Sequence, residues 1–384
     1  MKVAITFPGC HRRAGVERVV YECARYLAST DNQVTVLASE WDEIPHPRVK
    51  MVRIQNGPMP SFLQGIGFLR KCTKALRNIS FDVLNTHGCT CPFEGVHWVQ
   101  SVHAAWLERA KQFRLLGSWS WWRQHLNPAH RILLCQERAH FRGRRFRHLI
   151  ATTSAVKSDL TRLYGVPQND ITVIPNGFSP TEFNAARRMQ NRSAARSALS
   201  LDQDETVFLF AANELARKGY TTLLKAIVCL PDQNFKLLAV GRFSQKEAVK
   251  LAIEMGVVSR IIFHSSTDDI SWYHAASDAL VLPTQYEAFC LTILEALGSG
   301  LPVITTDVPG ARDVVRDGVN GKLIGNPDNV DGLAEAMASL CNKRITQEMS
   351  QETSSSVAGY KWPSLLNQYE SILQQHSNAK GLDV

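Results

Sequence analysis

Long apolar runs are missing from this chain of 384 residues. No run approaches about 18 residues, the length that spans a bilayer as a helix, so we expect no transmembrane helix. The chain opens directly on an apolar stretch, residues 2–7, without a basic leader or a hydrophobic leader core. We therefore expect no secretory signal and a cytoplasmic protein. Its 45% hydrophobic and 20% charged residues are ordinary for a globular protein.

Cysteine pairs at metal-binding spacing are scarce. The nine cysteines are scattered, and Cys89 and Cys91 have no second pair at zinc spacing. We interpret them as free thiols in a reducing compartment, because a disulfide framework or a zinc site would need regular pairs. Three of the thiols fall at apparent core positions, namely Cys23, Cys135 and Cys229.

Two common nucleotide-binding motifs are absent as well. Residues 2–7, 8–15 and 16–27 read as a strand, a loop and a helix, but the loop has neither G-x-G-x-x-G nor G-x-x-x-x-G-K-[ST]. A nicotinamide cofactor and a P-loop are therefore disfavoured. Asp268–Asp269 suggests a metal-binding pair, but a helix start explains these acids as caps. We expect no metal and no cofactor.

Acidic residues are nearly absent between residues 101 and 150. Ten Lys and Arg there face only Glu108 and Glu137, a net charge of +8 that equals the net charge of the whole chain. Five of the eight tryptophans lie in or beside this window. A solvated helical face remains one interpretation. Arg and Trp together favour a surface that faces anionic lipid or polysaccharide, and nucleic acid is disfavoured because no nucleic-acid motif accompanies residues 142–147.

Strand and helix patterns alternate along the chain, without a visible internal repeat. This alternation predicts an α/β fold with parallel sheets and helices on both faces. The length predicts two or three domains. We place a first domain at 1–175, a second at 176–356 and a final helical segment at 357–384.

The most informative stretch is residues 279–307, which reads as strand, loop, helix and strand. Glu287 falls in the loop and Glu295 in the helix. Eight residues correspond to about two helical turns, which puts the two carboxylates on a similar side, about 12 Å apart. An acid at a helix start can simply complement the helix dipole. The pair also suits the two ends of one extended ligand, at the sheet edge where open α/β folds bind ligands.

Glu287–x7–Glu295, followed by Ala-Leu-Gly-Ser-Gly-Leu-Pro-Val-Ile, resembles the signature of the family 4 retaining glycosyltransferases. The resemblance implies the GT-B fold, two Rossmann-like domains facing across a cleft, with a last helix crossing back to the first domain. It also implies that Glu287 holds the donor hexose and Glu295 the ribose. The turn that would cradle the donor diphosphate comprises Ala288, Phe289, Cys290 and Leu291.

Other positions match the same family. Lys218 of the Lys-Gly pair would contact the diphosphate, and Arg217 would replace the family's usual Arg, whose place reads Ala212-Asn213. Ala14-Gly15-Val16-Glu17-Arg18 is similar to the family's Gly-Gly-Val-Glu-Arg turn, with Gly15 toward the donor and Arg18 toward the acceptor. His87 and His103 end the expected strands 81–87 and 95–103. His103 matches a histidine that contacts the transferred sugar, and His87 is an acceptor-side candidate.

The resemblance implies a metal-independent enzyme that moves a hexose from a nucleotide sugar to a surface polysaccharide or lipid-linked saccharide. UDP-glucose or a related UDP-hexose is the first choice of donor and GDP-mannose the next. We expect His103, Glu287 and Lys218 to carry the reaction, and residues 101–150 to contact an anionic membrane peripherally. A nucleotide-sugar 2-epimerase that hydrolyses its donor and a non-enzymatic saccharide-binding protein remain alternatives.

Overall fold

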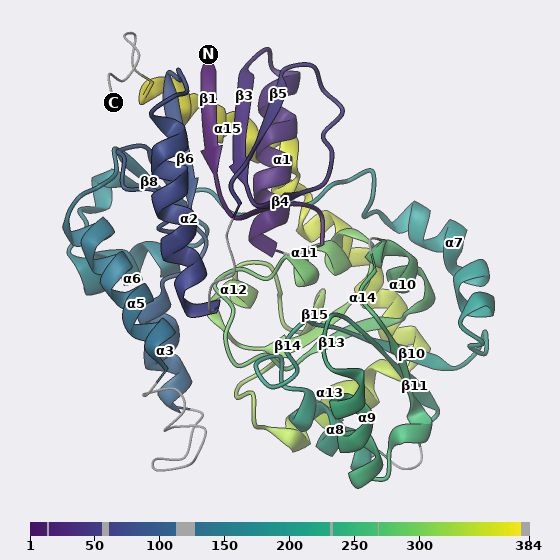
Figure 1. Ribbon diagram of the computed structural model, residues 1–384. Helices are drawn as coiled ribbons and strands as arrows, with labels where there is room; N and C mark the ends of the chain where they lie inside the picture. Colours follow the sequence, from purple (N-terminus) through teal and green to yellow (C-terminus); the bar gives the residue numbers. More distant parts are fainter. Residues whose placement is uncertain (14, 56–60, 113–126, 231–232, 268, 378–384) are drawn as a thin grey trace. The chain divides into compact units, whose positions relative to one another are not determined.

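The computed structural model describes the chain except for residues 14, 56–60, 113–126, 231–232, 268 and 378–384 (Figure 1). The chain divides into two compact α/β units. Unit 1 is Met1–Asn176 with Trp362–Val384, and unit 2 is Gly177–Lys361. The second division therefore falls at Lys361 and not at the expected 356. Unit 2 extends this far because the N–H of Phe178 donates to the carbonyl oxygen of Tyr360 at 2.9 Å, which ties its two ends together.

Unit 1 is built on a seven-stranded parallel sheet with the order β5-β3-β1-β6-β7-β8-β9. The chain starts in the middle of the sheet, moves to one edge and returns to build the other side, as in Rossmann-type sheets. A small two-stranded sheet pairs β2 with β4. The strands are β1 Lys2–Thr6, β2 Gly9–Cys10, β3 Gln33–Ala38, β4 Glu40–Trp41, β5 Val49–Arg53, β6 Val83–His87, β7 Val96–Val99, β8 His148–Ala151 and β9 Ile171–Val173.

The helix α15, Trp362–Gln375, completes unit 1 from the far end of the chain and packs on α1 and β6. The Glu370 carboxylate accepts hydrogen bonds from the Asn32 amide at 2.6 Å and the Thr30 hydroxyl at 2.9 Å. The ring of Tyr369 lies 5.1 Å from that of Trp98. The expected return of the last helix to the first unit is thus confirmed. The other helices of unit 1 are α1 Gly15–Ser29, α2 Ser61–Leu76, α3 His103–Gln112, α5 Pro128–Glu137, the π-helix η1 Arg138–Arg142 and α6 Ser154–Tyr164.

Local details of unit 1 differ from the sequence prediction. The strand expected over 95–103 is the shorter β7, and His103 is the first residue of α3. The helix starts there because the Glu137 carboxylate accepts the backbone N–H groups of His103 at 2.6 Å and Ala104 at 3.2 Å. Those N–H groups would otherwise lack partners at a helix start.

The nine cysteines are free thiols, and two of the three expected core positions are wrong. Cys23 lies on the buried side of α1, whereas Cys135 on α5 and Cys229 after α8 are exposed. Cys135 lies on an outward side of α5, and Cys229 is the residue that ends α8; single exposed apolar residues are common at such positions. Of the expected Asp caps, Asp269 does cap a helix, α10, by accepting the N–H of Ser271 at 3.1 Å.

Unit 2 repeats the same plan on a six-stranded parallel sheet of order β12-β11-β10-β13-β14-β15. Helices cover both faces (Figure 1). The strands are β10 Thr206–Ala211, β11 Phe235–Val240, β12 Ile261–His264, β13 Ala279–Leu282, β14 Val303–Thr306 and β15 Gly321–Ile324. The helices are α7 Ala185–Ala198, α8 Tyr220–Val228, α9 Gln245–Glu254, α10 Ile270–Ala276, α11 Leu291–Gly298, α12 Pro309–Arg312, α13 Val330–Leu340 and α14 Lys343–Ser356.

The apolar strands are what make unit 2 a doubly wound sheet. Every residue of β10, β13 and β14 is buried, as expected of strands covered on both faces. The strand order of the sheet reverses its direction between β10 and β13, which are neighbours. In such folds the loops that follow these two strands form the ligand-binding crevice.

Three arginines fasten α7 to α10, which lie side by side (Figure 1). Arg188, Arg192 and Arg196 recur every four residues and so share one face of α7. Arg188 donates to the carbonyl oxygens of His274 at 3.3 Å, Ser277 at 2.9 Å and Gly300 at 3.0 Å. Guanidinium groups thus satisfy the carbonyl oxygens that a helix leaves unpaired at its C-terminal end.

Replacing this buried guanidinium should destabilise unit 2. Arg188→Met removes three charge-assisted hydrogen bonds, to the carbonyl oxygens of His274, Ser277 and Gly300. At about 1 kcal/mol for each bond, we expect a loss of about 3 kcal/mol in the free energy of unfolding. Urea unfolding followed by circular dichroism measures it. Arg187→Met is the matched control, because Arg187 is exposed and reaches Asp269 only at 3.7 Å; its loss should stay within about 0.5 kcal/mol. Equal losses in the two variants would contradict the fastening role.

Candidate active site

Two loops of unit 2 meet where the strand order reverses. Residues 212–219 follow β10, and residues 283–290 follow β13. The loops touch directly, because the N–H of Gln285 donates to the carbonyl oxygen of Arg217 at 2.9 Å. The hydroxyl oxygen of Thr284 lies 3.3 Å from the same carbonyl oxygen. Lys218 and Glu287, which are far apart in sequence, are thereby brought to one edge of the sheet.

Gly219 allows this close approach. It has a positive φ of 77°, and a Cβ atom at this position would lie 1.9 Å from the carbonyl oxygen of Pro283. Only glycine fits both the conformation and the contact. It also serves as the N-cap of α8, so Lys218 stands immediately before a helix.

The Glu287 carboxylate is the centre of the site. One of its oxygens, Oε1, accepts from the Lys218 ammonium, from Nη1 of Arg217 at 3.2 Å and from the Thr284 hydroxyl at 3.0 Å. Arg217 also holds Glu214 by two hydrogen bonds of 3.1 Å. Glu287 and Lys218 are only 7% and 8% exposed, so they form a nearly buried ion pair, which Arg217 connects to the exposed carboxylate of Glu214.

The carboxylates keep both cations charged. Burial works to lower the pKa of Arg217, but Glu287 and Glu214 outweigh it and raise that pKa above its ordinary value. Burial likewise favours the neutral amine of Lys218, yet the Glu287 carboxylate helps to raise its pKa above the ordinary value. Cys290 itself stays a neutral thiol, because burial and the nearby Glu287 raise its pKa to about 11. The site therefore offers two fixed positive charges at neutral pH.

The segment after Glu287 leads into α11. Ala288, Phe289 and Cys290 precede the helix, and α11 starts at Leu291 without a hydrogen-bonding side chain at its N-cap, Cys290. Backbone N–H groups at such a start favour anions. Glu295 is buried in the second turn of α11. Glu287 in the loop and Glu295 in the helix match the local structure that the sequence predicts.

The four predicted site residues of unit 1 have different surroundings. Gly15 starts α1 and is exposed, while Arg18, one turn later, is 7% exposed. His103 is partly exposed at the start of α3; its Nε2 lies 3.1 Å from Nδ1 of His130, and its ring stacks on Trp106 at 5.4 Å. Burial, followed by the charge of His130, lowers the pKa of His103 to about 4, so the ring is neutral at neutral pH.

His87 lies in the core of unit 1, so the expectation that it faces a cleft is wrong. Its ring is fully buried, stacks on Trp98 at 5.8 Å and meets Phe7 edge-on at 6.3 Å. Within the described residues neither ring nitrogen has a hydrogen-bond partner. Burial lowers the pKa of His87 to about 3. His87 is the last residue of β6, as the sequence predicts. Its ring, however, packs between Phe7 and Trp98.

Sequence reasoning missed several residues that hold the site. Thr284 and Glu214 support Glu287 and Arg217, as described above. In unit 1, Glu137 joins the start of α3 to the Tyr164 hydroxyl, which donates to it at 2.6 Å. The one available signal was that Glu137 is one of only two acids in the basic window.

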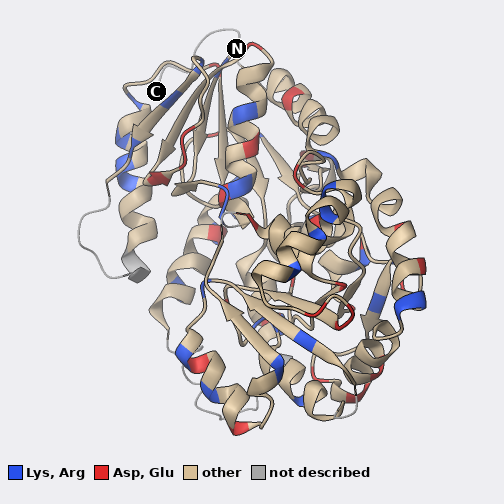
Figure 2. Ribbon diagram, turned by 90° about the vertical axis from the view of Figure 1, so that its right-hand side faces the viewer, with Lys and Arg blue, Asp and Glu red and all other residues tan. Residues whose placement is uncertain are grey.

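The basic window is described only in part. Arg114, Arg123, Trp119, Trp121 and Trp122 lie outside the described residues. The remaining cations lie on α3, α5, η1 and the loop that follows. Figure 2 marks Lys and Arg in blue and Asp and Glu in red along the chain. Over the described part of the chain, no helix is long and apolar enough to cross a bilayer. Nor is any group of three or more His, Cys, Asp and Glu placed there to hold a metal ion.

Two family models match the chain, one over each half. The model for group 1 glycosyl transferases matches residues 191–356, and the model for Glycosyltransferase Family 4 matches residues 13–182. Two Rossmann-type sheets, with a cationic site at the reversal point of the second, are the architecture of the GT-B fold class of glycosyltransferases. The chain belongs to the family 4 glycosyltransferases.

Sequence relatives match about half of this chain, whereas solved structures superpose on nearly all of it. Lipopolysaccharide glucosyltransferase WaaG of Escherichia coli is 28% identical over 225 residues, 58% of this chain and 59% of WaaG. A D-inositol 3-phosphate glycosyltransferase of Xylanimonas cellulosilytica is 33% identical over 189 residues, 47% of this chain and 45% of that protein. The chain thus spans about half the length of the curated relatives it matches.

Two crystal structures show the same fold. The structure of WaaG superposes with a TM-score of 0.84 at 21% identity, over 97% of this chain and 99% of that one. The structure of HepE from Anabaena, in complex with UDP and glucose, gives 0.75 at 18% identity, over 97% and 99%.

The buried His87 should make unit 1 sensitive to acid. The ring stays neutral when folded but binds a proton below about pH 6.5 when unfolded, so its stabilising contribution is present above that pH and falls as the pH drops toward 3. His87→Phe should reduce the slope of unfolding free energy between about pH 6 and pH 4 by about 1.4 kcal/mol per pH unit. Urea unfolding followed by tryptophan fluorescence measures this slope. His46→Phe, at a partly exposed position, should leave the slope unchanged, and an unchanged slope in His87→Phe would contradict the burial argument.

Proposed function

We propose that this protein is a retaining glycosyltransferase that moves a hexose from a nucleotide sugar to a saccharide acceptor. The observation that carries the proposal is the ion cluster of Arg217, Lys218 and Glu287 at the reversal point of unit 2. A glycosyl transfer from a nucleotide sugar breaks the bond between C1 of the sugar and a diphosphate oxygen. Two fixed cations beside that oxygen stabilise the charge that develops on it.

The donor would exchange partners within this cluster. Its diphosphate accepts hydrogen bonds from Lys218 and Arg217 and from the backbone N–H groups from Phe289 to Leu291. The Glu287 carboxylate, released in part from its cations, then accepts hydrogen bonds from hexose hydroxyls. Glu295 takes the ribose. Because the site carries both signs of charge before binding, the donor replaces existing ion pairs and does not have to create a charged site in the core.

The transfer itself needs no side-chain nucleophile. As the C1–oxygen bond breaks, an oxocarbenium-like sugar forms, and the acceptor oxygen bonds to C1 on the face that the diphosphate leaves. The acceptor proton passes to the departing diphosphate oxygen, so configuration at C1 is retained. His103, neutral at the start of α3, would donate or accept one hydrogen bond to a sugar hydroxyl, and Gly15 and Arg18 would lie near the donor and acceptor.

The favoured donor is UDP-glucose or a related UDP-hexose. HepE is a fold relative solved with UDP and glucose, and WaaG is a glucosyltransferase acting in lipopolysaccharide biosynthesis. The favoured acceptor is a surface polysaccharide or lipid-linked saccharide bound by unit 1. The basic residues of the 101–150 window would hold the enzyme at an anionic membrane surface, where such acceptors reside.

Donor binding should depend on Lys218. Calorimetric titration with UDP-glucose, UDP-N-acetylglucosamine and GDP-mannose, without added metal, should show one donor binding in preference. Lys218→Met should weaken that binding by about tenfold to a hundredfold, the worth of a charge-assisted hydrogen bond. Lys225→Met is the control, since Lys225 is exposed on α8. If both variants bind the donor as the wild type does, the assignment of Lys218 is wrong.

Turnover should depend on Glu287. Glu287→Gln removes the carboxylate that orients the hexose and balances both cations, so we expect UDP or GDP release to fall by about a hundredfold or more. Glu214→Gln makes the same charge change at an exposed partner of Arg217 and should cost less than about tenfold. Release is measured with and without a saccharide acceptor. Free hexose formed at the same rate in both cases would indicate hydrolysis and contradict transfer.

A further inference from the structure

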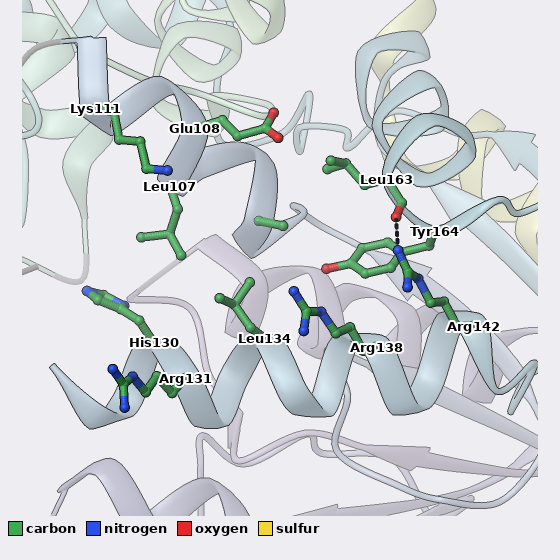
Figure 3. Close-up of a pocket in the computed structure, with 11 residues that line it drawn as sticks. Leu107, Glu108, Lys111, His130, Arg131, Leu134, Arg138, Arg142, Leu163 and Tyr164 are labelled. Atoms are coloured by element: carbon green, nitrogen blue, oxygen red, sulfur yellow. Dashed lines mark hydrogen bonds between the residues drawn. The ribbon is translucent and has the colours of Figure 1, made fainter. Parts of the chain in front are cut away.

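A cavity of about 460 Å³ lies between α3, α5 and α6 of unit 1 (Figure 3). The chemistry proposed above does not use it. Its middle is apolar, with Leu107 from α3, Leu134 from α5 and Leu163 from α6. The volume falls in the range of cavities that hold small organic ligands, about 300–1,000 Å³.

Helical spacing brings these side chains together. Arg131, Leu134, Arg138 and Arg142 follow one another at intervals of three and four residues, so they form one stripe along α5 and η1. The stripe on α3 runs from Ala104 through residues 107 and 108 to 111 at similar intervals. The two helices pack together, and their facing stripes enclose the cavity with the end of α6.

Positive charge dominates the lining. The four long cations are Lys111, Arg131, Arg138 and Arg142, against the single carboxylate of Glu108. Glu108 is already engaged, since Arg162 donates to it at 2.8 Å. Among the described residues, no carboxylate forms an ion pair with Lys111, Arg131 or Arg138. A cavity of this kind attracts anions.

Two of these cations point into the cavity. Figure 3 shows the Arg138 guanidinium and the Lys111 ammonium pointing into the space between the helices. Arg142 donates to the carbonyl oxygen of Leu163 at 3.3 Å, which fixes the α6 side of the lining. Ala104 to Lys111 spans about 10 Å of helix, at about 1.5 Å per residue. This length can cover a short hydrocarbon segment.

We propose that this cavity binds one amphiphile with a phosphate head group and an alkyl or prenyl chain. The hydrocarbon chain packs against the three leucines, and the phosphate is held by Arg138, whose planar fork matches two phosphate oxygens. The head group can belong to a membrane lipid or to a soluble phosphorylated amphiphile. The inference does not rest on the donor site of unit 2, because every lining residue belongs to unit 1.

Octyl phosphate is a suitable probe, titrated below its micelle concentration into the full-length protein by calorimetry. We expect saturable binding of one molecule. Inorganic phosphate lacks the alkyl chain, and octyl glucoside lacks the anionic head group. Each should therefore bind at least about tenfold more weakly than octyl phosphate. Octyl glucoside binding as well as octyl phosphate would overturn the proposal, because the cations would then have no role.

Variants locate the binding. Arg138→Gln should weaken octyl phosphate binding by about tenfold, the effect of one charge-assisted hydrogen bond. Leu134→Asn should weaken binding by a similar factor, because it removes an apolar contact of the alkyl chain. Arg77→Gln removes the same charge from an exposed position outside the cavity and should change nothing. If Arg138→Gln and Leu134→Asn both bind as the wild type does, while circular dichroism shows both folded, the cavity is not the site.

A competition distinguishes the two sources of the head group. If vesicles containing phosphatidylglycerol displace octyl phosphate, while neutral vesicles do not, the natural ligand is a bilayer lipid. If neither displaces it, the ligand is a soluble phosphorylated amphiphile. A parallel titration with UDP-glucose should be the same in Arg138→Gln and wild type. Absence of UDP-glucose binding beside intact octyl phosphate binding would count against the proposed transfer and not against this cavity.

Discussion

The ion cluster around Glu287 is the interaction on which the organisation of unit 2 depends. A nearly buried carboxylate is tolerable only with close cationic partners, and buried cations need it in return. Those partners come from a loop almost seventy positions earlier in the chain, by the numbering of Lys218 and Glu287. Parallel pairing of β10 with β13 puts both loops at one sheet edge. Gly219 then removes the side chain that would keep them apart.

The two units handle charge in opposite ways. In unit 2 the charges of the site are paired with charges of opposite sign. The short contacts between them exist before any ligand binds. In unit 1 the histidines near α3 are neutral, because burial lowers the pKa of His103 and His140 to about 4. The excess positive charge lies instead on exposed arginines of α5 and η1. One unit thus holds its site charges in ion pairs, and the other presents an excess of positive charge at its surface.

Much of this could be predicted from the sequence where the signal is local. The alternation of strands and helices predicts both sheets, and the stretch around Glu287 predicts a loop followed by a helix. The pairing of Lys218 with Glu287 could not be predicted, because it depends on which strands become neighbours. His87 was misplaced for a similar reason, since only the packing of Trp98 and Phe7 shows that its ring is covered. The role of Glu137 depends on α5 returning beside α3.

The position of α15 affects the order in which the two units can fold during synthesis. Unit 1 begins with the first strand of the chain, yet Asn32 and Thr30 find their partner in Glu370, and Trp98 packs on Tyr369. During synthesis, residues 177–361 leave the ribosome before α15 does. Domains usually fold as units in the order in which they emerge. Here the second unit can complete its core first, while the first waits for the last helix to close it.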